Sequence, residues 1–173
     1  VPDTFAAGSE CFPQELKVFQ AFNLDMARIN SREVSSHMSK VNGLRFLLNA
    51  YGLGIKANTA TDVLGQLIGE KFNSDLTVRR RSFQAKLAFD IFLKQLQKSK
   101  PDISFFFTNH VASSMHRYWP SVFPSDYTRL PYDQEWINRW KNEIPYTVKQ
   151  TSIHLKHLLK FVQDGHDVMV ITS

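Results

Sequence analysis

The sequence predicts an α/β fold in which a helix-rich N-terminal half is followed by parallel βαβ elements. Residues 103–107 and 168–172 are short apolar runs, typical of strands that are buried on both faces. Between them, residues 147–163 have the spacing of an amphipathic helix. A strand, a crossover, a helix and a second strand form a βαβ unit, whose strands are parallel and whose crossover is right-handed.

The composition is that of an ordinary globular domain. The chain has 173 residues, of which 43% are apolar and 21% charged, and no apolar stretch approaches the length of a membrane span. We therefore expect no membrane partner. The single Cys11 cannot form an internal disulfide, which favours a cytoplasmic location. Because Val1 is not an initiator Met, we expect a processed product or an excised piece, in which an upstream targeting segment would be invisible.

The N-terminal half has four helical segments with apolar residues at intervals of three and four. They are residues 14–30, residues 31–54 with a stop at Tyr51–Gly54, a segment from Thr59 or Thr61 to about Gly69, and residues 75–98. We expect the chain to divide into a helical region, residues 1–82, and an α/β region, residues 83–173.

Arg79, Arg80 and Arg81 lie in the first turns of the last of these segments. Three cations there oppose the helix dipole, so an anionic partner is one interpretation and a small basic module that binds polyanions is one hypothesis. A solvated face or a local pairing with carboxylates is the favoured interpretation. Nucleic acid is an unlikely partner, because the chain carries no known nucleic-acid signature.

The segment after the first predicted strand carries the densest group of chemically active side chains. Open α/β sheets build their sites where a buried strand ends, and here Thr108, Asn109 and His110 follow at once. An ordinary polar loop is the alternative. Four prolines then interrupt residues 120–146, where Tyr and Trp concentrate, so the aromatic loop 118–140 forms either the wall of a binding cleft or a satellite core. His154 and His157 are neighbours on a helix, and a solvated face is favoured there over a metal site.

The order of these features resembles the alkaline phosphatase superfamily, in its type I phosphodiesterase/nucleotide pyrophosphatase branch. In that family a helix leads to Pro-Asp, an apolar strand, and a loop with an Asp and then a His four residues later. Pro101-Asp102, residues 103–107 and His116 match in order and spacing, and residues 168–173 match the strand that ends in Thr-Ser. The resemblance covers residues 83–173. It implies an alkaline phosphatase-like sandwich, of which residues 1–82 would be a helical insertion.

The resemblance also implies a function and a site. The chain would be a portion of a metal-dependent phosphoester hydrolase, with a divalent metal, usually zinc, held by His116. The family's Asp falls on Ala112, so Asn109 or His110 would have to substitute as a ligand. Arg117 would contact a substrate phosphate or form a salt bridge, and Tyr118 and Trp119 would contact the substrate. The nucleophile and the Asp-His-Gly motif lie outside these residues, so we expect the isolated chain to be inactive.

Two further expectations concern partners. A degenerate, non-catalytic family member would still bind phosphate esters, nucleotides or glycans through the aromatic loop 118–140, and Ala112 favours that alternative. A phosphate-ester small molecule is therefore the expected ligand in either case. Sheet edges left without neighbouring strands would also favour a homo-oligomer.

Overall fold

The computed structural model describes residues 2–3, 6–29 and 40–172. The chain forms two compact units, Val1–Phe106 and Phe107–Ser173, which we call unit 1 and unit 2. The boundary between the two units follows the helix α4 (Arg80–Ser99), so this whole helix belongs to unit 1. The division expected between residues 82 and 83 falls inside the first turn of this helix.

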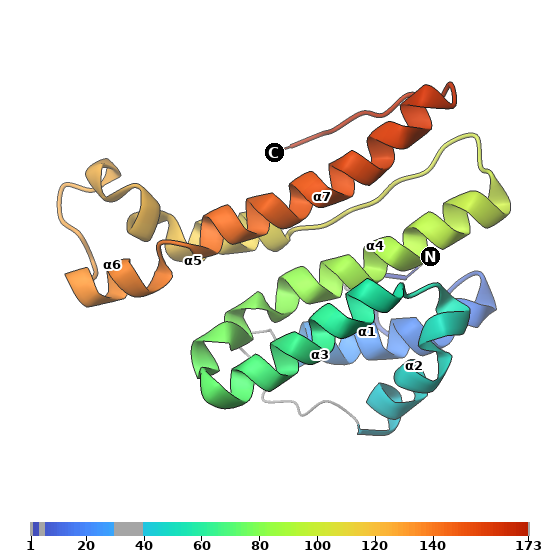
Figure 1. Ribbon diagram of the computed structural model, residues 1–173, viewed down its shortest axis with the longest axis horizontal. Coiled ribbons are helices and arrows are strands. Elements are labelled where there is room, and N and C mark those ends of the chain that lie inside the picture. The colour runs from blue at the N-terminus through green and yellow to red at the C-terminus, as the bar shows by residue number, and fades with distance from the viewer. Residues whose placement is uncertain (1, 4–5, 30–39, 173) are drawn as a thin grey trace. The chain divides into compact units, whose positions relative to one another are not determined.

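The described residues contain helices and no strand, so the predicted α/β fold with parallel βαβ elements is wrong (Figure 1). Residues 103–107 and 168–172 are non-helical, but no neighbouring strand pairs with either of them in the described part of the chain. A lone strand has no ladder of hydrogen bonds to stabilise it. Most of their apolar side chains are exposed, with Phe105 84% and Met169 83% accessible, whereas Phe106 packs on Phe89 and Phe92.

All regular secondary structure in the described part of unit 1 is helical. Its elements are η1 (Gln14–Leu16), α1 (Lys17–Ile29), α2 (Lys40–Leu53), α3 (Ala57–Phe72), η2 (Ser74–Arg79) and α4. The helices expected over residues 14–30, near 59–69 and over 75–98 are confirmed. The helix expected over residues 31–54 is confirmed from residue 40 onward, and its first nine residues lie outside the described part of the chain.

The core of unit 1 forms where one face of α2 meets α1 and α4. Phe19, Phe46, Leu53 and Ile91 are buried together, and the rings of Phe22 and Phe46 stack with centroids 4.4 Å apart. Each such side chain contributes roughly 1.5–3 kcal/mol by leaving water. The chain turns at Gly54, directly after α2, and the φ of 101° at this residue is one that residues with a side chain rarely adopt.

Unit 2 consists of α5 (His110–Val122), η3 (Pro124–Asp126), α6 (Gln134–Trp140) and α7 (Glu143–Gln163). The helices α5 and α7 pack along one another, and α6 packs on α5 (Figure 1). The sequence predicted a loop where α5 lies, so this helix was missed. The helix α7 begins four residues before the predicted start, because Pro145 lies in its first turn, where a missing N–H costs no helical hydrogen bond. No helix in the described ranges is long and apolar enough to cross a membrane.

Candidate functional site

His110, a predicted metal ligand, lies buried at the amino end of α5. Its Nδ1 is 2.7 Å from the Thr108 hydroxyl, and its Nε2 is 3.2 Å from the Thr151 hydroxyl of α7. Burial lowers the pKa of this imidazole, and a hydrogen bond with the Thr147 backbone opposes that shift only in part. His110 is thus a neutral group that joins α5 to α7, with both ring nitrogens in use.

The other predicted metal ligands do not gather around His110. Asn109 and His116 are exposed, and His116 lies six residues further along α5. Six residues correspond to roughly 9 Å along a helix and about 120° around it, so these two imidazoles face different sides. Within the described ranges, no three His, Cys, Asp or Glu side chains form a group that could hold a metal ion. In the described part of the chain, His110, Asn109 and His116 therefore do not come together as the ligands of one metal ion.

His154 shows that one expectation of a solvated face was wrong. The residue is buried, and its ring centroid lies 6.1 Å from that of His110. Ser114, one turn after His110 on α5, is buried on the same side of the helix. Buried polar side chains therefore lie where α5 packs on α7, and the Ser114 hydroxyl has no hydrogen-bond partner there among the described residues.

The predicted substrate-binding residues separate into different surroundings. Arg117 is half-buried on α5, and Tyr118 is buried. The indole Nε1 of Trp119 donates a hydrogen bond of 2.7 Å to Asp126, which fixes the segment after α5. Of the three, only Tyr118 contacts the aromatic residues of α6 and of the segment that precedes it.

These aromatic residues form a continuous stack that we call the aromatic ladder: Tyr132, Trp136, Tyr118 and Trp140. The rings of Tyr132 and Trp136 stack with centroids 3.7 Å apart, and Tyr118 stacks on Trp140 at 5.2 Å. Arg139 lies over the Trp140 ring. Tyr132, at the other end, is the most exposed member. The ladder explains how a proline-rich segment is held in place, and its outer ring offers a flat apolar face to a ligand.

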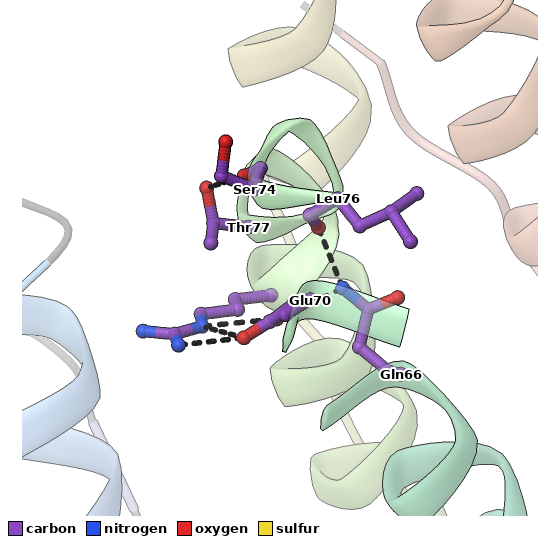
Figure 2. A network of polar contacts seen from close by, with 6 residues as sticks. Gln66, Glu70, Ser74, Leu76 and Thr77 are labelled. Carbon is purple, nitrogen blue, oxygen red and sulfur yellow. Dashed lines mark hydrogen bonds and ion pairs between the residues drawn. The ribbon is translucent and has the colours of Figure 1, made fainter. Parts of the chain in front are cut away.

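Within the basic triplet Arg79–Arg81, Arg80 pairs with a carboxylate of unit 1, which is the local pairing that the favoured interpretation predicts. Figure 2 shows the polar contacts of Glu70 and Gln66 around this pair. The Arg80 guanidinium binds the Glu70 carboxylate in a fork, with its Nη2 2.6 Å from Oε2. Gln66 donates to Glu70 and to the Leu76 carbonyl. Burial acts to raise the pKa of Glu70, but the hydrogen bonds from Arg80 and Gln66 outweigh it and the pKa is lowered. Arg80 therefore ties α4 to α3 and is not available to a polyanion.

Unit 1 also contains a hollow of about 520 Å³ between α1, α2 and the segment that precedes α1. We call it the cationic pocket, because Lys17, Arg28 and Arg45 line it with a single carboxylate, Asp25. Asn42 of α2 donates a hydrogen bond of 2.9 Å to Asp25 and so joins the two helices at the pocket wall. Val18, Ala21 and Leu24 supply an apolar floor.

The periodicity of α1 explains how these residues meet. Positions 17, 21, 24 and 28 are separated by three or four residues, so they share one face of the helix. The sequence did not predict this pocket, because its cations are distant from one another along the chain. The signal that was present is the recurrence of Lys17 and Arg28 on the same face as Ala21 and Leu24.

No protein-family model, no curated protein and no solved structure matches this chain.

Proposed function

We propose that the chain binds a small phosphate ester with an apolar body, and that the cationic pocket of unit 1 is the binding site. The observation that carries this proposal is the meeting of Lys17, Arg28 and Arg45 around one hollow. Lys17 is shared with Glu10, so the two guanidinium groups supply most of the attraction for an anion. Arginine suits phosphate because its planar fork donates two parallel hydrogen bonds.

The size and lining of the pocket define the class of ligand. Its volume of about 520 Å³ lies in the range of roughly 300–1,000 Å³ that is usual for small-molecule sites. The apolar floor of Val18, Ala21 and Leu24 favours a ligand that carries a ring or an alkyl group beside its phosphate. Three cations against one carboxylate leave the lining with an excess of positive charge, which disfavours cationic ligands.

Phosphoester hydrolysis rests on the resemblance alone. The residues that the resemblance assigns to chemistry belong to unit 2, and the pocket belongs to unit 1. Binding is therefore the function proposed for the chain, and catalysis would need the nucleophile and metal ligands that the family carries in other segments.

Calorimetric titration with phenyl phosphate tests this proposal. Phenyl phosphate combines a doubly charged anion with an apolar ring, whereas inorganic phosphate lacks the ring and phenol lacks the charge. We expect saturable binding of phenyl phosphate, weaker binding of inorganic phosphate and none of phenol. Since a hydrogen bond to a charged group contributes roughly 1.5–3 kcal/mol, Arg28→Gln and Arg45→Gln should each weaken binding about tenfold or more.

Lys71→Gln is the matched control, because Lys71 is an exposed cation of the same unit on α3. It should leave the affinity unchanged, apart from the small effect of net charge. Equal affinity of the wild type and the Arg28→Gln/Arg45→Gln double variant would exclude the pocket as the site. Absence of saturable binding to the wild type would refute the proposed function.

The aromatic ladder favours a second candidate function, the binding of a glycan or a nucleotide base by unit 2. The exposed face of Tyr132 continues a stack that already orients its ring, so a flat ligand would meet a rigid platform. Tryptophan fluorescence titration with a nucleoside monophosphate and with an oligosaccharide would detect it. Tyr132→Ala should abolish the response, while Tyr127→Ala, an exposed tyrosine outside the ladder, should not.

A further inference from the structure

The segment that precedes α1 places a carboxylate beside the cationic pocket. Gly8 and Ser9 form part of the pocket lining, and the next residue, Glu10, forms an ion pair with Lys17 of α1. Lys17 lines the pocket itself, whereas Glu10 does not. The proposed site for a phosphate therefore contains a cation that already has an anionic partner from the same chain.

The segment that carries Glu10 is fixed to α1 on both sides of this residue. Toward the amino end, the fully buried Gln20 side chain accepts a hydrogen bond of 2.8 Å from the Asp3 N–H and donates one of 2.7 Å to the Asp3 carbonyl. Toward the carboxyl end, η1 leads directly into α1. Because the segment is held at both ends, the Glu10 carboxylate stays near Lys17 and competes with a free anion at a high effective concentration.

The ion pair of Glu10 and Lys17 can open at little cost in stability. The Glu10 side chain is 77% exposed and that of Lys17 44%, and ion pairs between exposed groups contribute little. In the described part of the chain, the Glu10 carboxylate pairs with Lys17 alone, whereas a phosphate in the pocket can also bind the guanidinium groups of Arg28 and Arg45. An anion that binds the two arginines can therefore displace Glu10 from Lys17.

We propose that Glu10 is an internal competitor of the ligand: it occupies Lys17 in the free protein, and a bound phosphate ester takes its place. This inference rests on the proposed function of the cationic pocket. Lys17 exchanges one anionic partner for another, so the net gain from this residue is small and binding depends on the two arginines. Glu10 thereby disfavours anions that would contact Lys17 alone and selects those that also reach Arg28 or Arg45.

Calorimetric titration of phenyl phosphate into Glu10→Gln tests this proposal. The substitution keeps the length of the side chain and removes its charge, so the ligand no longer has to displace an anion from Lys17. We expect Glu10→Gln to bind about two- to fivefold more tightly than the wild type, which corresponds to the strength of an exposed ion pair.

Glu15→Gln is the matched control, because Glu15 is an exposed acid of the same unit that does not line the pocket and pairs instead with Lys98 of α4. It removes the same charge and should change the affinity by less than about 1.5-fold at physiological salt. The substituted side chains of Glu10 and Glu15 are both largely exposed, so the circular dichroism of the two variants should match that of the wild type.

A double-mutant cycle shows whether Glu10 acts through Lys17. In the Lys17→Gln background, Glu10→Gln should tighten binding no more than the Glu15→Gln control does, because the two anions no longer share a cation. Equal affinity of the wild type and Glu10→Gln, or an equal gain with and without Lys17, would overturn this inference and leave the proposed function intact. Absence of saturable binding to the wild type would refute the proposed function itself, and this inference with it.

Discussion

Two groups of three cations in unit 1 have opposite surroundings. Arg79–Arg81 are contiguous in the sequence, yet Arg80 is committed to Glu70 and ties α4 to α3. Lys17 and Arg45 are 28 positions apart in the sequence with Arg28 between them, yet the three meet around one hollow. A run of like charges in a sequence therefore predicts little about an anion site. A group of cations can form an anion site only where the side chains surround a space that a ligand can enter.

The same contrast separates two histidines of α5 in unit 2. His110 is buried and joined to two threonine hydroxyls, whereas His116 is exposed. Both were predicted as metal ligands from one stretch of sequence. Their difference comes from the helical period, because a six-residue separation directs the two side chains to different sides of the helix. Substitution of the buried, hydrogen-bonded side chains should therefore lower stability more than substitution of the exposed ones.

The largest effect is expected for Arg80→Leu. Its loss would leave the nearly buried Glu70 carboxylate without its cation, and breaking such a pair costs about 3–5 kcal/mol when both groups are buried. Because Arg80 is partly exposed, we expect a decrease of about 2–3 kcal/mol in the free energy of unfolding. Urea denaturation monitored by circular dichroism measures it.

The double variant Arg80→Leu/Glu70→Leu sharpens this result. Removing the orphaned carboxylate should restore part of the lost stability, so the two changes should be non-additive. A stability of Arg80→Leu within about 0.5 kcal/mol of the wild type, the usual range for surface changes, would contradict the structural role assigned to Arg80.

A smaller effect is expected for His110→Ala. The change removes two side-chain hydrogen bonds at the interface of α5 and α7 and leaves the Thr151 hydroxyl with one partner fewer. We expect a loss of about 1–3 kcal/mol, measured by urea denaturation. His116→Ala, at an exposed position of the same helix, is the matched control and should change stability by no more than about 0.5 kcal/mol. Equal losses for the two variants would show that His110 does not join the helices.

The pH dependence of stability should distinguish the contribution of His110 in unit 2 from that of Glu70 in unit 1. The pKa of His110 is lowered on folding, so its neutral form is favoured in the native state. Its contribution is complete above the unfolded pKa of about 6.5 and is lost as pH falls from there through the folded pKa, at up to about 1.4 kcal/mol per pH unit. The pKa of Glu70 is also lowered, so its contribution is complete above about pH 4.3 and is lost below that.

Amide hydrogen exchange measured at a series of decreasing pH values reports the stability of the two units separately. Amides of α5 and α7 should lose protection first, starting near pH 6.5, and those around Glu70 only below about pH 4.3. His110→Ala should remove the first step and leave the second. Loss of protection around Glu70 at the higher pH would contradict the assignment.

The smallest effect concerns the triplet itself. Because neither Arg79 nor Arg81 lines the cationic pocket, Arg79→Gln/Arg81→Gln should not change the affinity for phenyl phosphate beyond the general effect of two fewer cations. We expect less than a threefold change at about 0.15 M salt, where charges more than roughly 8 Å apart are largely screened. Calorimetry at that salt concentration measures it, and a tenfold loss would move the anion site to the triplet.

The sequence predicted the helices of unit 1 because their apolar residues recur at the helical period, and that signal is local. It failed at residues 103–107 and 168–172, since an apolar run becomes a strand only beside another strand and no neighbour is present in the described chain. It also missed α5, whose serines and Pro120 suggested a loop. Pro120 is accommodated near the end of that helix.

The candidate sites were harder to predict than the helices. Tyr118 belongs to the aromatic loop 118–140, for which the sequence allowed either a cleft wall or a satellite core, and its ring stacks on Trp140. The cationic pocket was not foreseen, because Arg45 reaches it from a different helix than Lys17 and Arg28. The meeting of these side chains depends on how α1 packs against α2, and no local sequence pattern predicts that packing.

The most direct test of this account is a titration of phenyl phosphate into three proteins side by side: the wild type, Arg28→Gln/Arg45→Gln and Arg79→Gln/Arg81→Gln. Both double variants lose two positive charges, so net charge is matched and only position differs. We predict that the pocket variant loses affinity by about tenfold or more while the triplet variant binds like the wild type. Equal losses in both variants would reduce the effect to net charge and contradict the proposal that the cationic pocket is the binding site.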